Sequence, residues 1–114
     1  MANQESVQQL KDSFTDCQPM LEALGDVNRQ NILLTLCDTS CTTGLRVGDI
    51  TEAVNLSRPA VSHHLKILKD AKLVTMRKEG SMNFYFADIH TNFAKLTQLL
   101  ASLDALKEIN NRND

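Results

Sequence analysis

The sequence predicts a mainly α-helical domain that carries one small β-hairpin, with elements in the order α-α-α-α-α-β-β-α. Two observations support this fold class. Apolar residues recur at helical spacing along most of the chain, and between Leu73 and Asp88 the spacing changes to the alternation typical of strands. The length of 114 residues fits one domain, so we expect residues 1–114 to form a single domain.

Two helices are expected before Gly25. Residues 5–16 form a polar amphipathic pattern whose apolar face includes Phe14. Pro19 is expected to start a second, short helix, because proline is tolerated in the first turn of a helix. Glycine commonly follows the last helical residue, so this second helix should end at Gly25.

Three further helices are expected between Asp26 and Lys72. Asp26 is a good N-cap for the first of them, and a polar loop over residues 38–44 follows that helix. The next helix begins after Leu45 and ends at a tight turn, Asn55-Leu56. Ser57 then caps the third helix, and Pro59 stands in its first turn.

The end of the chain combines a hairpin with a long helix. Leu73–Arg77 and Met82–Asp88 are expected to form two strands joined by a turn over residues 78–81. From Thr91 to about Ile109 the helical pattern returns, with a wide apolar stripe between residues 93 and 106. The stripe is too wide for a lone surface helix, so we expect it to pair with the first helix in a homodimer.

The two helices joined by the Asn55-Leu56 turn form a helix-turn-helix, and the hairpin after them is a wing. A recognition helix presents short polar side chains at its N-terminal end, which enters the major groove. Arg58 can donate two hydrogen bonds to guanine, and lysines further along the helix can contact phosphates. The predicted DNA-binding residues are Ser57, Arg58, Ala60, Ser62, His63, Lys66, Lys69, Arg77 and Lys78.

The distribution of charge agrees with a DNA-binding face. The formal net charge is −2, yet residues 58–78 hold six basic residues against one acidic residue. Residues 1–26 hold one basic residue against five acidic residues. A basic stripe on a neutral or acidic body is typical of a phosphate-binding surface, although a solvated helix face would produce the same count.

The adjacent pair His63-His64 has two interpretations. A metal site is one, but neighbouring residues on a helix point about 100° apart, so both side chains rarely bind one ion. The other interpretation places one histidine outward and packs the other. We expect His63 to face outward and His64 to be partly buried.

Three stretches resemble the ArsR family of dimeric winged-helix repressors. They are residues 23–29 (ALGDVNR), residues 61–68 (VSHHLKIL) and residues 71–74 (AKLV). The family usually has proline where Val27 stands and glycine where Lys72 stands. The resemblance implies a dimer built from the first and last helices, operator DNA as the partner, and release from DNA when an inducer binds.

The resemblance also implies two places where relatives hold metals. The first is a Cys-x-Cys on the helix-turn-helix, which falls here on Arg46 and Gly48, so an arsenical or soft-metal site of that type is not expected. The second lies between paired last helices and falls on Asp88, His90, Ala101 and Asp104. Because Ala101 offers no lone pair, only three of four zinc ligands survive, and water would have to complete the shell. The alternative is that Asp88 or His90 merely caps the last helix.

Three cysteines with no expected secretion signal argue against a disulfide framework. Cys37 is expected to be buried on an apolar helix face, and Cys41 to be accessible in a polar loop. These two are close enough in sequence to pair if the loop bends, so a thiol switch remains one alternative. Three cysteines without a redox role are the other.

These observations predict a sequence-specific DNA-binding transcriptional regulator, a repressor released from its operator by an unidentified signal. The alternative is a winged-helix module for protein–protein assembly without DNA binding. An enzyme is not expected, because neither a nucleophile-base pair nor a glycine-rich phosphate loop is visible. The polar N-terminus and the absence of a long apolar run predict a cytoplasmic protein without a membrane partner.

Overall fold

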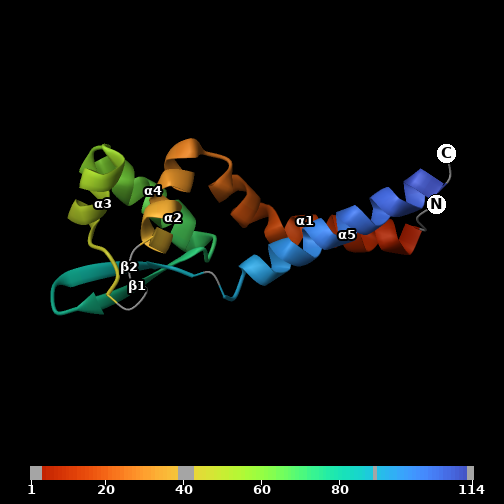
Figure 1. The fold of residues 1–114 in the computed structure, drawn as a ribbon. Coiled ribbons are helices and arrows are strands. Elements are labelled where there is room, and N and C mark those ends of the chain that lie inside the picture. The colour runs from red at the N-terminus through yellow and green to blue at the C-terminus, as the bar shows by residue number, and fades with distance from the viewer. Residues whose placement is uncertain (1–3, 39–42, 89, 113–114) are drawn as a thin grey trace. The chain divides into compact units, whose positions relative to one another are not determined.

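The computed structural model describes residues 4–38, 43–88 and 90–112, and these residues form five helices and one two-stranded sheet (Figure 1). The elements are α1 (Gln4–Leu24), α2 (Val27–Asp38), α3 (Val47–Val54), α4 (Arg58–Asp70), β1 (Val74–Glu79), β2 (Met82–Ala87) and α5 (Phe93–Arg112). The chain divides into two compact units. One contains the chain up to Gln18 together with the chain from His90 onward, and the other contains Pro19–Ile89.

The mainly α-helical fold class with a hairpin wing is confirmed, but the number of helices before Gly25 was wrong. A single helix, α1, runs through Pro19, so the order is α-α-α-α-β-β-α. Proline inside a helix costs roughly 3 kcal/mol relative to a good helix former. Cys17, Met20 and Ala23 on either side of Pro19 are all buried. Burial of these side chains keeps the helix continuous where local propensity favours a break.

The expected N-cap of α2 is confirmed. The Asp26 Oδ1 atom accepts hydrogen bonds from the backbone N–H groups of Asn28, at 2.9 Å, and Arg29, at 3.1 Å. The bond from the Arg29 amide is the largest cause that holds the pKa of Asp26 below its ordinary value. Because the pKa of Asp26 is lower in the folded state than in the unfolded state, its ionised carboxylate stabilises the fold at any pH above the unfolded-state pKa. This stabilisation is lost as the pH falls through the folded-state pKa.

The core of the Pro19–Ile89 unit lies where α2, α3, α4 and the hairpin meet (Figure 1). The apolar stripe expected on α4 is confirmed, because Val61, Leu65 and Leu68 are all buried. Ile50 from α3 and Ile32 from α2 are fully buried as well. The buried face of α4 therefore packs against α2 and α3, and the opposite face of its first turns is exposed to solvent.

The end of α4 forms a Schellman motif around Lys72. The Leu73 N–H donates to the Leu68 carbonyl, at 3.0 Å, and the Lys72 N–H donates to the Lys69 carbonyl, at 2.9 Å. Lys72 takes a φ of 62°, in the left-handed region that favours glycine. This geometry agrees with the glycine that the resemblance to the ArsR family implies at position 72, because glycine adopts a left-handed φ without strain.

Replacing Lys72 by glycine should therefore stabilise the protein. Removing the Cβ relieves a left-handed strain of roughly 1–2 kcal/mol, and the entropy cost of glycine offsets part of that gain. We expect a net increase in the free energy of unfolding of about 0.5–1 kcal/mol, measured by urea denaturation. The matched control is Lys69→Gly, in the last helical turn, which should be destabilising. Equal destabilisation by both changes would contradict the assignment of strain to Lys72.

The wing is an antiparallel hairpin that pairs Val74 with Ala87 and Glu79 with Met82. The expected hairpin is confirmed, with β1 shifted to end at Glu79 instead of Arg77 and the turn reduced to Gly80 and Ser81. Leu45 and Tyr85 exchange backbone hydrogen bonds of 2.9 and 2.8 Å. This bridge joins the segment before α3 to β2, so the wing and the helix-turn-helix are held together by backbone contacts.

The other unit carries the exposed apolar surface of α1 and α5. Leu99 is buried, whereas Leu100 is 59% exposed. Val7, Phe14 and Leu103 are also exposed large apolar side chains of these two helices. Of the stripe expected along α5, one part is thus covered within a single chain and another part is left on the surface.

Candidate nucleic-acid interface

The first turns of α4 present polar side chains to solvent, as expected for a recognition helix. The Ser57 Oγ atom accepts a hydrogen bond from the Ala60 N–H at 3.3 Å, so Ser57 is the N-cap. Ser62 and His63 are exposed, and Ala60 is half-buried. The short side chains leave the helix end open to a close approach, which major-groove binding requires.

The expectation for the two histidines is confirmed, since His63 is exposed and His64 is half-buried. The Nδ1 atom of His64 lies 3.4 Å from Nη1 of Arg29. Arg29 also donates to the Ala23 carbonyl at 2.8 Å and to the Glu22 carbonyl at 3.2 Å. Arg29 therefore joins the end of α1 to α4 and fixes the base of the recognition helix, a role that sequence reasoning missed.

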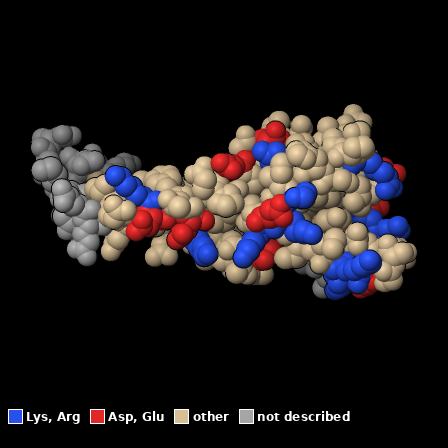
Figure 2. Space-filling view, turned by 180° about the vertical axis from the view of Figure 1, so that it is seen from behind, with Lys and Arg blue, Asp and Glu red and all other residues tan. Residues whose placement is uncertain are grey.

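The predicted phosphate-contacting cations are all exposed on α4 and β1. Figure 2 shows several Lys and Arg side chains gathered at its right-hand end, the end where α3 and the hairpin lie. Lys66 forms an ion pair of 3.2 Å with Asp70, and Arg77 forms one of 3.0 Å with Glu79. The Arg77 guanidinium also lies 5.0 Å from the centre of the Phe86 ring, which orients it. Both surface pairs are weak enough to exchange for phosphates.

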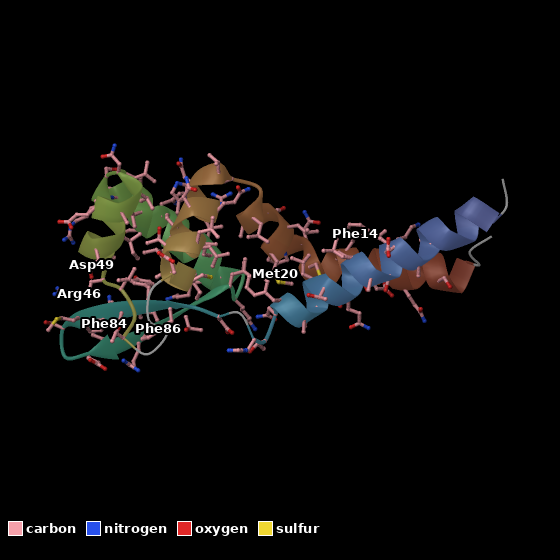
Figure 3. The ribbon with its side chains drawn as sticks, viewed as in Figure 1. Phe14, Met20, Arg46, Asp49, Phe84 and Phe86 are labelled. Atoms are coloured by element: carbon pink, nitrogen blue, oxygen red, sulfur yellow. The ribbon has the colours of Figure 1, made fainter. Side chains whose placement is uncertain are left out.

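A hollow of about 300 Å³ lies between the start of α3, the start of α4 and the hairpin tip. Residues 46–49 of the α3 start, Arg58 at the start of α4, and residues 81–83 at the hairpin tip line it. Figure 3 shows Arg46 and Asp49 together at the beginning of α3. Sequence reasoning singled out Arg58 but missed Arg46, because only the fold brings the α3 start beside the hairpin tip.

The cysteines do not match the sequence expectation in full. Cys37 is exposed, so the prediction that it is buried was wrong. It is the penultimate residue of α2, where the helix leaves the core, although Leu36 beside it is buried. Cys17 is the buried thiol instead. Cys41 lies outside the described residues, so the candidate pair of Cys37 and Cys41 stays a prediction.

Of the expected metal positions, Asp88 and His90 precede α5, and Ala101 and Asp104 lie in the middle of that helix. Asp88 is half-buried, and His90, Ala101 and Asp104 are exposed. Within the described part of one chain, no group of three or more His, Cys, Asp or Glu side chains could hold a metal ion. A zinc site that draws ligands from two subunits stays a prediction, and its donor set contains a methyl group, Ala101, in place of one ligand.

None of the helices in the described part of the chain has the length and apolar composition needed to cross a membrane.

The fold and the exposed polar end of α4 agree with comparisons to known proteins. A family profile described as "Bacterial regulatory protein, arsR family" matches residues 26–76, which contain the helix-turn-helix and the start of the wing. The chain is 33% identical over 101 residues to an arsenical resistance operon repressor of Staphylococcus aureus, covering 88% of each chain. It is 36% identical to the transcriptional repressor SdpR of Bacillus subtilis over 66 residues, which cover 58% of this chain and 69% of that protein.

Solved structures show the same fold. An ArsR-like transcriptional regulator from Rhodococcus superposes with a TM-score of 0.69 at 22% identity, over 90% of this chain and 86% of that one. The winged arrangement of α2, α3, α4 and the hairpin is shared, and the relatives are named as regulators of transcription. The chain therefore belongs to the ArsR family and is a DNA-binding transcriptional regulator with a winged helix-turn-helix.

Proposed function

We propose that the protein binds operator DNA as a homodimer, represses transcription there, and is released by a signal that acts on the folded protein. The observation that carries this proposal is the exposed face of α4, where Ser62 and His63 project from a helix whose opposite face is buried. Cations on α4 and β1 flank that face and supply phosphate contacts. The protein has a regulatory role, and we assign it no catalytic one.

A homodimer is supported by the surface of α1 and α5. Exposed leucine and phenylalanine side chains on these two helices would be covered by the same helices of a second copy. Two recognition helices related by a two-fold axis bind half-sites separated by about one helical turn, ~10 bp. Localisation in the cytoplasm follows from this role, since the operator is there.

We do not expect the signal to be an arsenical or another soft metal bound at the start of α3. A thiolate pair at the start of α3 would be required for that type of site, and Arg46 and Gly48 occupy those positions. A guanidinium and a hydrogen atom cannot bind a soft metal. Among the described residues, the thiol of Cys37 is exposed and therefore accessible to oxidants. A redox signal is thus the second candidate.

Footprinting on the DNA upstream of the protein's own gene tests the proposal. We expect protection of a pseudo-palindrome with two half-sites about 10 bp apart, and binding that weakens steeply as salt concentration rises. Protection of one asymmetric half-site would contradict the dimer. Tight binding to a protein partner, with no salt-sensitive binding to any duplex, would favour the assembly module instead.

Removing the Ser62 hydroxyl should weaken sequence-specific binding. We expect Ser62→Ala to lower the affinity for the footprinted site by about 1–3 kcal/mol and to leave the affinity for a shuffled duplex nearly unchanged. Lys78→Ala serves as the contrasting variant, because a lost phosphate contact weakens binding to both duplexes and lowers the salt slope by about 1. Fluorescence anisotropy over a salt series measures both quantities. Identical profiles for the two variants would remove Ser62 from the base-reading surface.

Zinc should have little effect on DNA binding. Zinc can release DNA only if it binds the free protein and the DNA-bound protein with different affinities. A site with an incomplete ligand shell binds zinc weakly, so the difference between these two affinities should be small. We expect the affinity for the footprinted site to be the same with added zinc and with a chelator. The matched variant is Ala101→His, which supplies the missing ligand and should tighten zinc binding in calorimetry. Release of the natural protein from DNA by zinc would contradict this prediction.

A further inference from the structure

We propose that Arg46 and Arg58 bind one and the same backbone phosphate of the DNA duplex, in the hollow between the start of α3, the start of α4 and the hairpin tip. The inference rests on the proposed binding of duplex DNA. It changes the role expected for Arg58, from reading a guanine to holding the DNA backbone. It also adds Arg46 to the DNA-binding surface.

The position of the Arg58 guanidinium favours a contact with the DNA backbone. A Cβ atom built on Gly48 would lie 3.0 Å from the Arg58 Nη2 atom and 4.0 Å from its Cζ atom. The guanidinium therefore lies against the first turn of α3. In a helix-turn-helix the second helix enters the groove and the first crosses the backbone. A guanidinium held against the first helix is aimed at the backbone and away from the base edges.

The charge of the two arginines that line the hollow also favours a bound anion. Arg46 and Arg58 line one hollow, and neither guanidinium forms an ion pair with a carboxylate among the residues that the structure describes. The one carboxylate of the lining, Asp49, accepts a hydrogen bond of 3.1 Å from the Arg46 backbone N–H. Lys66 and Arg77, by contrast, have carboxylate partners. Two like charges that face one hollow favour an anion between them.

The chemistry and size of the hollow fit a phosphate. Arginine donates hydrogen bonds in a planar fork that matches two phosphate oxygens. Ser81 and Asn83 add a hydroxyl and a carboxamide at the hairpin side. The hollow, with a volume of about 300 Å³, leaves room for a phosphodiester group.

Gly48 leaves room for the Arg58 guanidinium beside the first turn of α3. Glycine in a helix is less favourable than alanine by roughly 0.5–1 kcal/mol. A side chain at this position would meet the Arg58 guanidinium, as the 3.0 Å distance from the built Cβ shows. The absence of a side chain therefore favours the arginine arrangement over local helix stability.

A double-mutant cycle on the full-length protein tests whether the two arginines share one phosphate. The variants are Arg46→Ala, Arg58→Ala and the double replacement. Lys95→Ala, an exposed cation on α5 outside the predicted DNA contacts, is the matched control for loss of one charge. Fluorescence anisotropy gives the affinity over a salt series for two labelled duplexes, the DNA upstream of the protein's own gene and a shuffled sequence of equal length.

Each single variant should weaken binding to both duplexes by the same factor, about tenfold. Because the remaining arginine still neutralises the shared phosphate, each single variant should lower the slope of log affinity against log salt by much less than about 0.9, the value for one phosphate. The double variant leaves that phosphate without a cation and should lower the slope by about 0.9. Lys95→Ala should leave the slope as in the natural protein.

Three results would overturn the inference. A loss for Arg58→Ala on the upstream duplex alone would mean that Arg58 reads a base. A slope loss of about 1.8 in the double variant would mean two separate phosphates. Single variants that bind like the natural protein would remove the hollow from the interface. These results leave the proposed function intact, whereas a natural protein without salt-sensitive binding to either duplex overturns the function itself.

A second variant keeps both arginines and fills the hollow. Gly48→Glu places a carboxylate among them, and glutamate is favourable in the first turn of a helix, so α3 should still form. We expect circular dichroism and thermal unfolding to match the natural protein, with affinity for both duplexes reduced more than by Arg46→Ala. Unchanged affinity in a folded Gly48→Glu protein would also overturn the inference.

Discussion

If the protein is a homodimer as proposed, replacing Leu100 by glutamate should convert it to monomers and abolish operator binding at concentrations that saturate the natural protein. Leu100 is 59% exposed on α5 in a single chain, the highest value among the large apolar side chains of α1 and α5 whose burial the structure describes. In a dimer that buries this surface, an unpaired carboxylate would lose its hydration, at a cost of several kcal/mol. One half-site supplies only part of the binding free energy, so the affinity should fall by at least on the order of 100-fold.

Sedimentation velocity measures the association, and Ala94→Glu provides the matched control. Ala94 is exposed on the same helix, and helical spacing puts it opposite the apolar stripe. The control variant should sediment as a dimer and bind DNA as the natural protein does. A normal dimer from Leu100→Glu would show that the subunits associate through another surface, and insoluble protein would be compared with Leu100→Gln, which adds no charge.

Replacing Gly44 by alanine should strongly destabilise the winged unit. Gly44 has a φ of 69°, where a Cβ costs roughly 1–2 kcal/mol. That Cβ would also lie 2.6 Å from the Cζ atom of Phe86 on β2, closer than any real contact. Moving a packed ring typically costs a further 1–3 kcal/mol, so we expect a total loss of about 2–5 kcal/mol in the free energy of unfolding.

Gly80, in the hairpin turn, is the matched control, because its φ is also positive but no atom lies close to the Cβ that alanine would add. Its φ is 62°, and no atom lies within 4 Å of the Cβ that alanine would add. Gly80→Ala should therefore show only the conformational cost. Urea denaturation of both variants isolates the contact with Phe86 as the difference between them. Equal losses would show that the Phe86 ring moves aside freely, and the bridge between Leu45 and Tyr85 would then not depend on Gly44.

Local sequence signals predicted the parts of the fold that depend on neighbouring residues. Asp26 and Ser57 cap their helices because a side-chain oxygen reaches backbone N–H groups two or three residues away. The buried stripe on α4 follows from the period of a helix, and the hairpin was predicted from the change to a shorter period, although the side chains of β2 do not alternate between buried and exposed. The resemblance of residues 61–68 to the ArsR family predicted the function, which the comparisons confirm.

Tertiary structure alone decided the features that depend on residues far apart in the chain. Burial on both sides of Pro19 keeps α1 continuous, against the local preference for a break. Cys37 continues an apolar pattern yet is exposed, because the helix leaves the core there. The hollow that joins Arg46 to Arg58 and the contact of Gly44 with Phe86 exist only once the hairpin has folded back onto α3. Periodicity records which face of an element is apolar, whereas distances between elements depend on how those faces pack.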